Sequence, residues 1–193
     1  MIKLTTKELL QMDRSLFSGK VICFATDTVF GVGCIYDEAF PEAESKIYQM
    51  KERDPNKPLA LLVSSLSQVV GHLVMSQEIA LLTNYWPGAL TIIFATSDDY
   101  FSPIAANYSV GIRIPHCDNA LAILDYLGAM ATTSVNKSGE PPLNDPILIE
   151  KQFGSMIDYL VTDLCASSGA SSTVVDVRST PFKILRQGDI KIN

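Results

Sequence analysis

Cationic side chains gather in one short stretch of the sequence. Lys46, Lys51, Arg53 and Lys57 lie at and just beyond the end of an expected helix. Cations near a helix C-terminus complement the helix dipole, and several acidic residues share this stretch, so a solvated helix face explains the cluster as well. The cluster alone therefore leaves a structural and a binding interpretation open.

Other polar segments follow expected β-strands. They are Thr26-Asp27-Thr28, Arg113, and residues 134–138. Because ligands gather at the carboxyl ends of strands in open α/β sheets, we expect these segments to share one edge and to line one pocket. Lys, Arg, Ser and Thr side chains, with almost no His or carboxylate beyond Asp27, suit an anionic ligand that needs charge neutralisation more than proton transfer. Phosphoryl or nucleotidyl transfer is the chemistry that fits best.

Two short motifs have simpler explanations than the functions they suggest. Gly31-Val32-Gly33 lacks the third glycine and the immediate helix of a dinucleotide fingerprint, so we interpret it as two glycines that ease a strand-to-loop turn. Ser134-x-x-Lys137 matches the Ser-x-x-Lys of serine acyl-enzymes, but the chain has no Lys-Thr-Gly partner motif. A polar turn after a strand is the simpler interpretation.

Alternating helices and strands must position these residues. Thr5 and Glu8 form a capping box, which predicts a helix that ends at Gly19, and Asp145 with Pro146 predicts the start of a late helix. We expect further helices at 38–52, from Ser65 to Gln68 onward, before Trp86, and at 118–127, and strands at 21–25, 59–63, 90–95, 109–114, 129–134, 157–162, 172–177 and 182–186. This pattern predicts a three-layer mixed α/β fold with parallel and antiparallel strands.

Composition limits the protein class. The chain has 193 residues, of which 47% are hydrophobic and 19% charged, and this predicts one globular domain over residues 1–193. No apolar run approaches the roughly 18 residues of a membrane span, so we expect a cytoplasmic protein without membrane contact. The four cysteines form no Cys-x-x-Cys pair, and only two histidines exist, so we expect no metal site. The net charge of −6 argues against a protein that mainly coats nucleic acid.

Seven sequence blocks together resemble the YrdC-like family of threonylcarbamoyl-AMP synthases, in its short single-domain form. The resemblance covers about residues 19 to 188. The blocks are GKVICFATDTVFGVG (19–33), Lys51-x-Arg53 with Lys57-Pro58-Leu59, Trp86-Pro87-Gly88 with Leu90-Thr91, VGIRIP (110–115), TSVNKSG (133–139), STVVD (172–176) and ILRQG (184–188). The chain departs from the family pattern at Ala25, at Val135, and in the loop Cys165–Ser171, which replaces a glycine-rich loop.

The resemblance implies a fold, a reaction and a site. The fold would be a twisted mixed sheet flanked by helices around a basic cavity. Lys51 and Arg53 would be catalytic and, with Lys57, would bind the ATP phosphates. Ser134, Asn136 and Arg186 would complete the ATP site, and Thr26, Arg113, Thr132 and Ser172 would hold L-threonine.

The implied reaction condenses L-threonine, bicarbonate and ATP to threonylcarbamoyl-AMP and pyrophosphate, for N6-threonylcarbamoyladenosine in tRNA. Mg²⁺ would arrive on the phosphates, since the chain offers no carboxylate cluster to hold it. The product would pass to a tRNA threonylcarbamoyl transferase complex, and contact with tRNA itself would be weak or indirect. The alternative is an RNA-binding or ribosome-maturation module of the same fold that lacks this catalysis.

Overall fold

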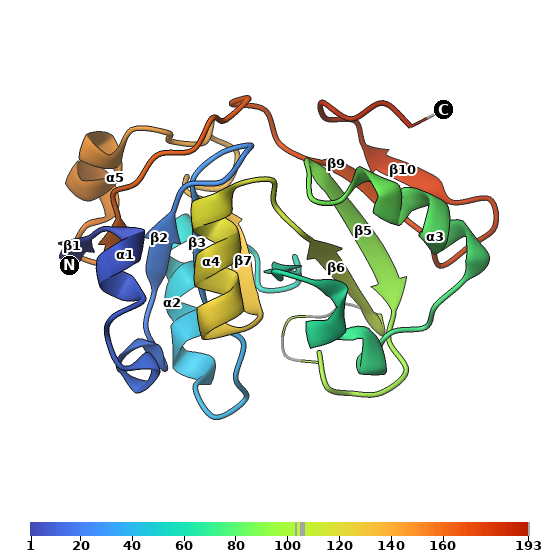
Figure 1. Cartoon of the computed structure of the whole chain (residues 1–193), viewed down its shortest axis with the longest axis horizontal. Helices are drawn as coiled ribbons and strands as arrows, with labels where there is room; N and C mark the ends of the chain where they lie inside the picture. The colour runs from blue at the N-terminus through green and yellow to red at the C-terminus, as the bar shows by residue number, and fades with distance from the viewer. Residues whose placement is uncertain (103, 105–106, 193) are drawn as a thin grey trace.

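The protein is built on one ten-stranded sheet with helices on both of its faces (Figure 1). The computed structural model describes residues 1–102, 104 and 107–192. The strands are β1 (Ile2–Leu4), β2 (Ile22–Phe24), β3 (Gly31–Ile35), β4 (Ala60–Leu62), β5 (Leu90–Ala95), β6 (Ser109–Arg113), β7 (Met130–Ser134), β8 (Tyr159–Val161), β9 (Thr173–Asp176) and β10 (Lys183–Arg186). The α-helices are α1 (Thr6–Leu9), α2 (Pro41–Lys51), α3 (Gln77–Leu82), α4 (Asp118–Leu127) and α5 (Pro146–Phe153).

The sheet mixes parallel and antiparallel neighbours, which confirms the predicted fold class. Its order is β1-β8-β2-β3-β7-β4-β6-β5-β9-β10. Strands β1, β8 and β2 run parallel, as do the pairs β4 with β6 and β5 with β9, and the remaining neighbours are antiparallel. No helix in the described part of the chain has the length and apolar character needed to cross a membrane.

The expectation that the polar segments share one carboxyl edge holds for the segments after β2 and β7, but it is wrong for Arg113. Strands β2 and β7 are both antiparallel to β3, and their last residues, Phe24 and Ser134, both pair with Gly31. Strand β7 is antiparallel to β4, whereas β4 is parallel to β6, so β6 and β7 run in opposite directions. The register therefore places Arg113, which ends β6, level with Met130 at the start of β7, and four residues from Ser134 at its other end. Arg113 and Ser134 can therefore line one cavity only if it extends across a face of the sheet.

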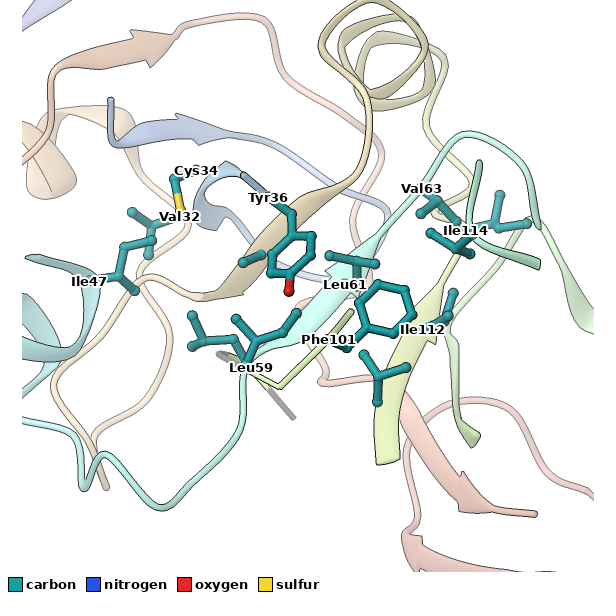
Figure 2. Packing of buried hydrophobic residues seen from close by; sticks show 14 of the residues in the cluster. Val32, Cys34, Tyr36, Ile47, Leu59, Leu61, Val63, Phe101, Ile112 and Ile114 are labelled. Carbon is teal, nitrogen blue, oxygen red and sulfur yellow. The ribbon is translucent and has the colours of Figure 1, made fainter. Parts of the chain in front are cut away.

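Two hydrophobic clusters occupy the opposite faces of the sheet. Helices α2, α3 and α5 pack on one face, where Ile47 of α2 lies against Val32 and Cys34 of β3 (Figure 2). On the other face, α1 and α4 pack against Ile22, Phe24 and further buried side chains of the half of the sheet that contains β2, β3 and β7. This second face is covered by helices over only one half of the sheet.

Residues 31–33 form part of a central strand, not the strand-to-loop turn that we predicted. Strand β3 pairs with β2 on one side and with β7 on the other, and all five of its residues are buried. A Cβ atom at Gly33 would lie 2.5 Å from Thr132 Oγ1 and 2.7 Å from Ala131 O. The glycine is therefore required because β7 approaches the β3 backbone closely at this point.

Two predicted helices are much shorter in the structure. The Thr5/Glu8 capping box is present, but α1 ends at Leu9 and a 3₁₀-helix at Arg14–Phe17 replaces its predicted continuation. Strand β1, which the sequence analysis missed, precedes it. The Ser65–Gln68 pattern yields only a 3₁₀-turn at Leu66–Gln68, and Ser65 makes no capping hydrogen bond. The Gln68 side chain accepts from Ser64 N and donates to Leu124 O.

Candidate active site

The uncovered half of the second face forms a cavity of about 440 Å³. In β4, β5 and β6 alternate residues line it, because successive side chains of a strand point to opposite faces. In β6, Ser109, Gly111 and Arg113 face the cavity, whereas Val110 and Ile112 belong to the core on the other face. The strand residues that line it are Gly31, Ala60, Leu62, Thr91, Ile93, Ser109, Gly111, Arg113, Thr132, Thr133, Ser134, Val174 and Arg186.

Apolar and small or polar residues alternate in β6 and around Thr91 in β5, and this is a second sequence signal for the cavity. Small or polar residues occupy every second position of Ser109-Val110-Gly111-Ile112-Arg113, and Thr91 lies between the buried Leu90 and Ile92. A solvated face on a strand that is otherwise apolar indicates a polar cavity or bulk water. The signal therefore marks the cavity face, but not which strands share it.

Cationic side chains from three distant segments meet at the cavity. Arg53, Lys57, Arg113 and Arg186 all line it. The Arg53 guanidinium donates to Lys57 O at 3.2 Å and to Pro58 O at 3.0 Å, which fixes it against the turn after α2. The Lys57 side chain is exposed. The structure thus brings together three of the predicted ATP-binding residues, Arg53, Lys57 and Arg186, with Arg113.

Arg113 is held by three partners within the protein. Its Nε donates to Gly88 O at 3.1 Å, its Nη1 to Thr28 Oγ1 at 2.7 Å, and its Nη2 to Asp27 Oδ1 at 2.5 Å. Burial lowers the pKa of the Arg113 guanidinium, and the charge of Asp27 acts in the opposite direction. A guanidinium has five N–H donors, so two remain for a ligand.

Asp27 is a site residue to which the sequence analysis gave no role. Its side chain is 12% exposed, and it forms an ion pair with Arg113, whose side chain is 8% exposed. Its carbonyl oxygen accepts from Ser168 N at 3.0 Å, and Thr28 O accepts from Gly169 N at 2.9 Å. The loop Cys165–Ser171 is therefore attached to the segment that holds Arg113, and its last residue lines the cavity.

The predicted threonine-binding residues all line the same cavity. Thr26 is buried, and its Oγ1 donates to Val29 O at 2.6 Å, so it shapes the turn after β2. Thr132 Oγ1 donates to Met130 O at 3.0 Å. Ser172 Oγ lies 2.8 Å from Thr91 Oγ1 and accepts from Arg186 Nη2 at 3.2 Å, which joins the predicted threonine and ATP residues in one network.

Lys51 and Asn136 lie behind the cavity wall. Neither is among the described residues that line the cavity, and Lys51 is only 1% exposed. The Lys51 ammonium donates to Ser134 O, to Asn136 O and to Asn136 Oδ1, at 2.5, 2.9 and 2.8 Å. Burial, with a smaller contribution from the charge of Arg53, lowers the pKa of Lys51 to about 8. Ser134 itself does line the cavity.

This arrangement is suited to binding negatively charged groups. Cations and hydroxyl groups surround the cavity, and apolar residues such as Val29 and Ile93 provide contact area for a less polar part of a ligand. Among the described residues, no group of three or more His, Cys, Asp or Glu side chains is placed to bind a metal ion. The chemistry available is charge neutralisation and positioning.

The chain is similar to proteins that have been named as enzymes or solved as structures. A threonylcarbamoyl-AMP synthase of Vibrio campbellii is 28% identical over 188 residues, which are 94% of this chain and 100% of that protein. One of Bacillus subtilis is 30% identical, over 95% of this chain and 54% of that protein. The crystal structure of P. abyssi Sua5 complexed with L-threonine matches with a TM-score of 0.82 and 25% identity, over 97% of this chain and 58% of that chain.

A second solved structure has a similar fold, and a family model matches most of the sequence. E. coli YciO matches with a TM-score of 0.78 and 21% identity, over 97% of this chain and 93% of that chain. The Sua5/YciO/YrdC family model, described as "Telomere recombination", matches residues 14–188. The chain therefore belongs to the Sua5/YciO/YrdC family.

Proposed function

We propose that this protein is an L-threonylcarbamoyladenylate synthase, which condenses L-threonine, bicarbonate and ATP to threonylcarbamoyl-AMP and pyrophosphate. The observation that carries the proposal is the convergence of Arg53, Lys57, Arg113 and Arg186 on one hydroxyl-rich cavity. The names of the Vibrio and Bacillus relatives, and the Sua5 structure with L-threonine, support the same reaction.

The proposed reaction joins reactants that carry negative charge. The threonine amine attacks the carbon of bicarbonate, and loss of water leaves a carbamate. A carbamate oxygen then forms a bond to the α-phosphorus of ATP, while the bond from that phosphorus to the bridging oxygen breaks and pyrophosphate leaves. The cationic cavity wall would offset the Coulomb repulsion between carbamate and triphosphate, which is why positioning matters more than a general base.

Each reactant has an assigned region in this proposal. Arg53, Lys57 and Arg186 would neutralise the phosphates. The two unused N–H groups of Arg113 would bind the threonine carboxylate as a bidentate pair, while Asp27 and Thr28 fix the guanidinium plane. Mg²⁺ would be held by the phosphates, since the described residues provide no cluster of metal ligands.

The proposed biological role is supply of the activated threonylcarbamoyl group for N6-threonylcarbamoyladenosine in tRNA. Threonylcarbamoyl-AMP is a mixed anhydride, so its acyl group is activated for attack by an amine, with AMP as the leaving group. A second enzyme would direct this transfer to the adenosine amine of tRNA. A tRNA threonylcarbamoyl transferase complex is the proposed partner, and the cytoplasm is the proposed compartment.

The direct test is pyrophosphate release from ATP and Mg²⁺ in the presence of L-threonine and bicarbonate. We expect release that depends on both, with threonylcarbamoyl-AMP detected by mass spectrometry. Arg53→Ala should abolish most of the activity, whereas the matched control Lys46→Ala should not, because Lys46 is exposed on α2 and lies outside the cavity. Equal release without threonine would refute the proposal, and RNA binding with a steep salt dependence but no release would favour a non-catalytic RNA-binding module.

A further inference from the structure

The Lys51 ammonium group has no hydrogen-bond donor left for a ligand. An ammonium has three N–H donors, and Lys51 directs its Nζ at three oxygen atoms of residues 134–136. Its own carbonyl oxygen accepts from Ser138 N at 2.8 Å. The last residue of α2 is thus bonded to both ends of the segment that follows β7.

The Asn136 side chain is equally occupied. Its Oδ1 accepts from Lys51 Nζ and, at 2.6 Å, from Ser134 Oγ. Its Nδ2 donates to Lys137 O and to Glu140 O, both at 2.8 Å. Because both amide protons are used, and because the Ser134 proton points to Asn136, a nucleotide would have to break existing bonds in order to contact either Lys51 or Asn136.

We propose that Lys51 and Asn136 are positioning residues that act as one unit: they hold Ser134 and the backbone of residues 134–138 against the cavity and make no contact with the phosphates. This inference rests on the proposed function and assigns phosphate contact to Arg53, Lys57 and Arg186 instead. It differs from the direct phosphate role that the family resemblance implies for Lys51.

The buried position of Lys51 gives a physical reason for this division. A direct phosphate ligand must remain charged and accessible, as Arg53 is at the cavity surface. Lys51 is enclosed by neutral carbonyl and amide oxygens, with no carboxylate paired to it in the described structure. Such a group fixes geometry through its hydrogen bonds, and its removal leaves several buried acceptors unpaired.

A double-mutant cycle tests whether the two residues act as a unit. In pyrophosphate release, Lys51→Met and Asn136→Ala should each lower kcat/KM about ten- to a hundredfold, and the double variant should be no worse than the poorer single variant. The control cycle pairs Arg53→Ala with Asn136→Ala, whose losses should multiply, because the Arg53 guanidinium donates to the 57–58 backbone and shares no hydrogen-bond partner with Asn136 among the described residues. Multiplying losses in the Lys51/Asn136 cycle would overturn the proposal.

Nucleotide binding separates positioning from phosphate contact. Lys51→Met should weaken the binding of ATP, ADP and AMP by one common factor, whereas Arg53→Ala should weaken ATP binding most and AMP binding least. A loss by Lys51→Met that grows with the number of phosphates would contradict the inference. Should Lys51→Met fail to fold, Asn136→Asp replaces it in the series, because the carboxylate still accepts from Lys51 and Ser134 but cannot donate to the two carbonyls.

A urea-unfolding cycle keeps this inference separate from the proposed function. Lys51→Met and Asn136→Ala should show strongly non-additive loss of stability, whether or not the wild-type protein releases pyrophosphate. Additive losses would refute the structural unit. Absence of pyrophosphate release by the wild type, together with non-additive unfolding, would refute the proposed reaction and leave the unit intact.

Discussion

Lys51 and Arg113 are both buried cations next to the same cavity, but their partners differ in kind. Arg113 is paired with the carboxylate of Asp27 and keeps two N–H groups free for a ligand. Lys51 is surrounded by neutral oxygens that use all of its donors, and its pKa is lowered to about 8. The comparison indicates that burial with a counter-charge preserves a binding cation, whereas burial among neutral acceptors produces a structural one.

The first prediction removes the buried cation that has a counter-charge. Arg113→Ala should lower the free energy of unfolding by about 3–5 kcal/mol, because Asp27 is left buried without its partner. Threonine-dependent pyrophosphate release should also be lost. Urea unfolding measures the first effect, and the double variant Asp27→Asn/Arg113→Ala should regain part of the lost stability. If Arg113→Ala were as stable as the wild type, the ion pair would have no structural role.

The second prediction concerns a cation that lies at the cavity surface. Arg53→Ala should remove a charge-assisted interaction worth about 1.5–3 kcal/mol, and thus about ten- to a hundredfold in kcat/KM. Its urea midpoint should change little, since its partners are two backbone carbonyls near the surface. Full activity of this variant would remove Arg53 from the proposed phosphate site.

The third prediction tests the charge state of Lys51 through stability. The pKa of Lys51 is about 8 in the folded protein, and its ordinary value of 10.5 applies to the unfolded chain. Between pH 8 and 10.5 the unfolded chain therefore binds more protons than the folded protein. The burial penalty is fully present below pH 8 and is relieved as the pH rises towards 10.5. Wild type should therefore gain stability relative to Lys51→Met over this window, on the order of 1 kcal/mol per pH unit. Urea unfolding of both proteins from pH 7 to 10.5 measures the difference, and parallel curves would show that Lys51 does not titrate there.

The smallest effect is expected at Lys57, which is an exposed cation of the cavity. Lys57→Ala should raise the KM for ATP about two- to fivefold, because solvent screens an exposed charge. The wild-type KM should approach that of the variant as salt is added, whereas the loss in Arg53→Ala should persist. Steady-state kinetics at low and high salt distinguish the two, and a salt-independent effect at Lys57 would mean that its ammonium is desolvated by the ligand.

Much of the fold followed from local sequence patterns. The Asp145/Pro146 helix start and the apolar strands near 90–95 and 109–114 were predicted because capping and alternation act over a few residues. The short length of α1 and the presence of strands β1 and β3 were not predicted. Each depends on a distant segment: β1 pairs with β8, and β3 lies between β2 and β7.

For the candidate site, too, some features followed from the sequence and others only from the tertiary structure. By itself the sequence determined which residue types are available for anion binding and, through its resemblance to a family, which of them to examine. Only the tertiary structure decided that Arg113 is paired with Asp27 and that Lys51 donates to Ser134 and Asn136 and does not line the cavity. The physical reason is that strand direction and side-chain alternation set which face a residue occupies, and that burial and hydrogen-bond saturation depend on neighbours remote in the chain.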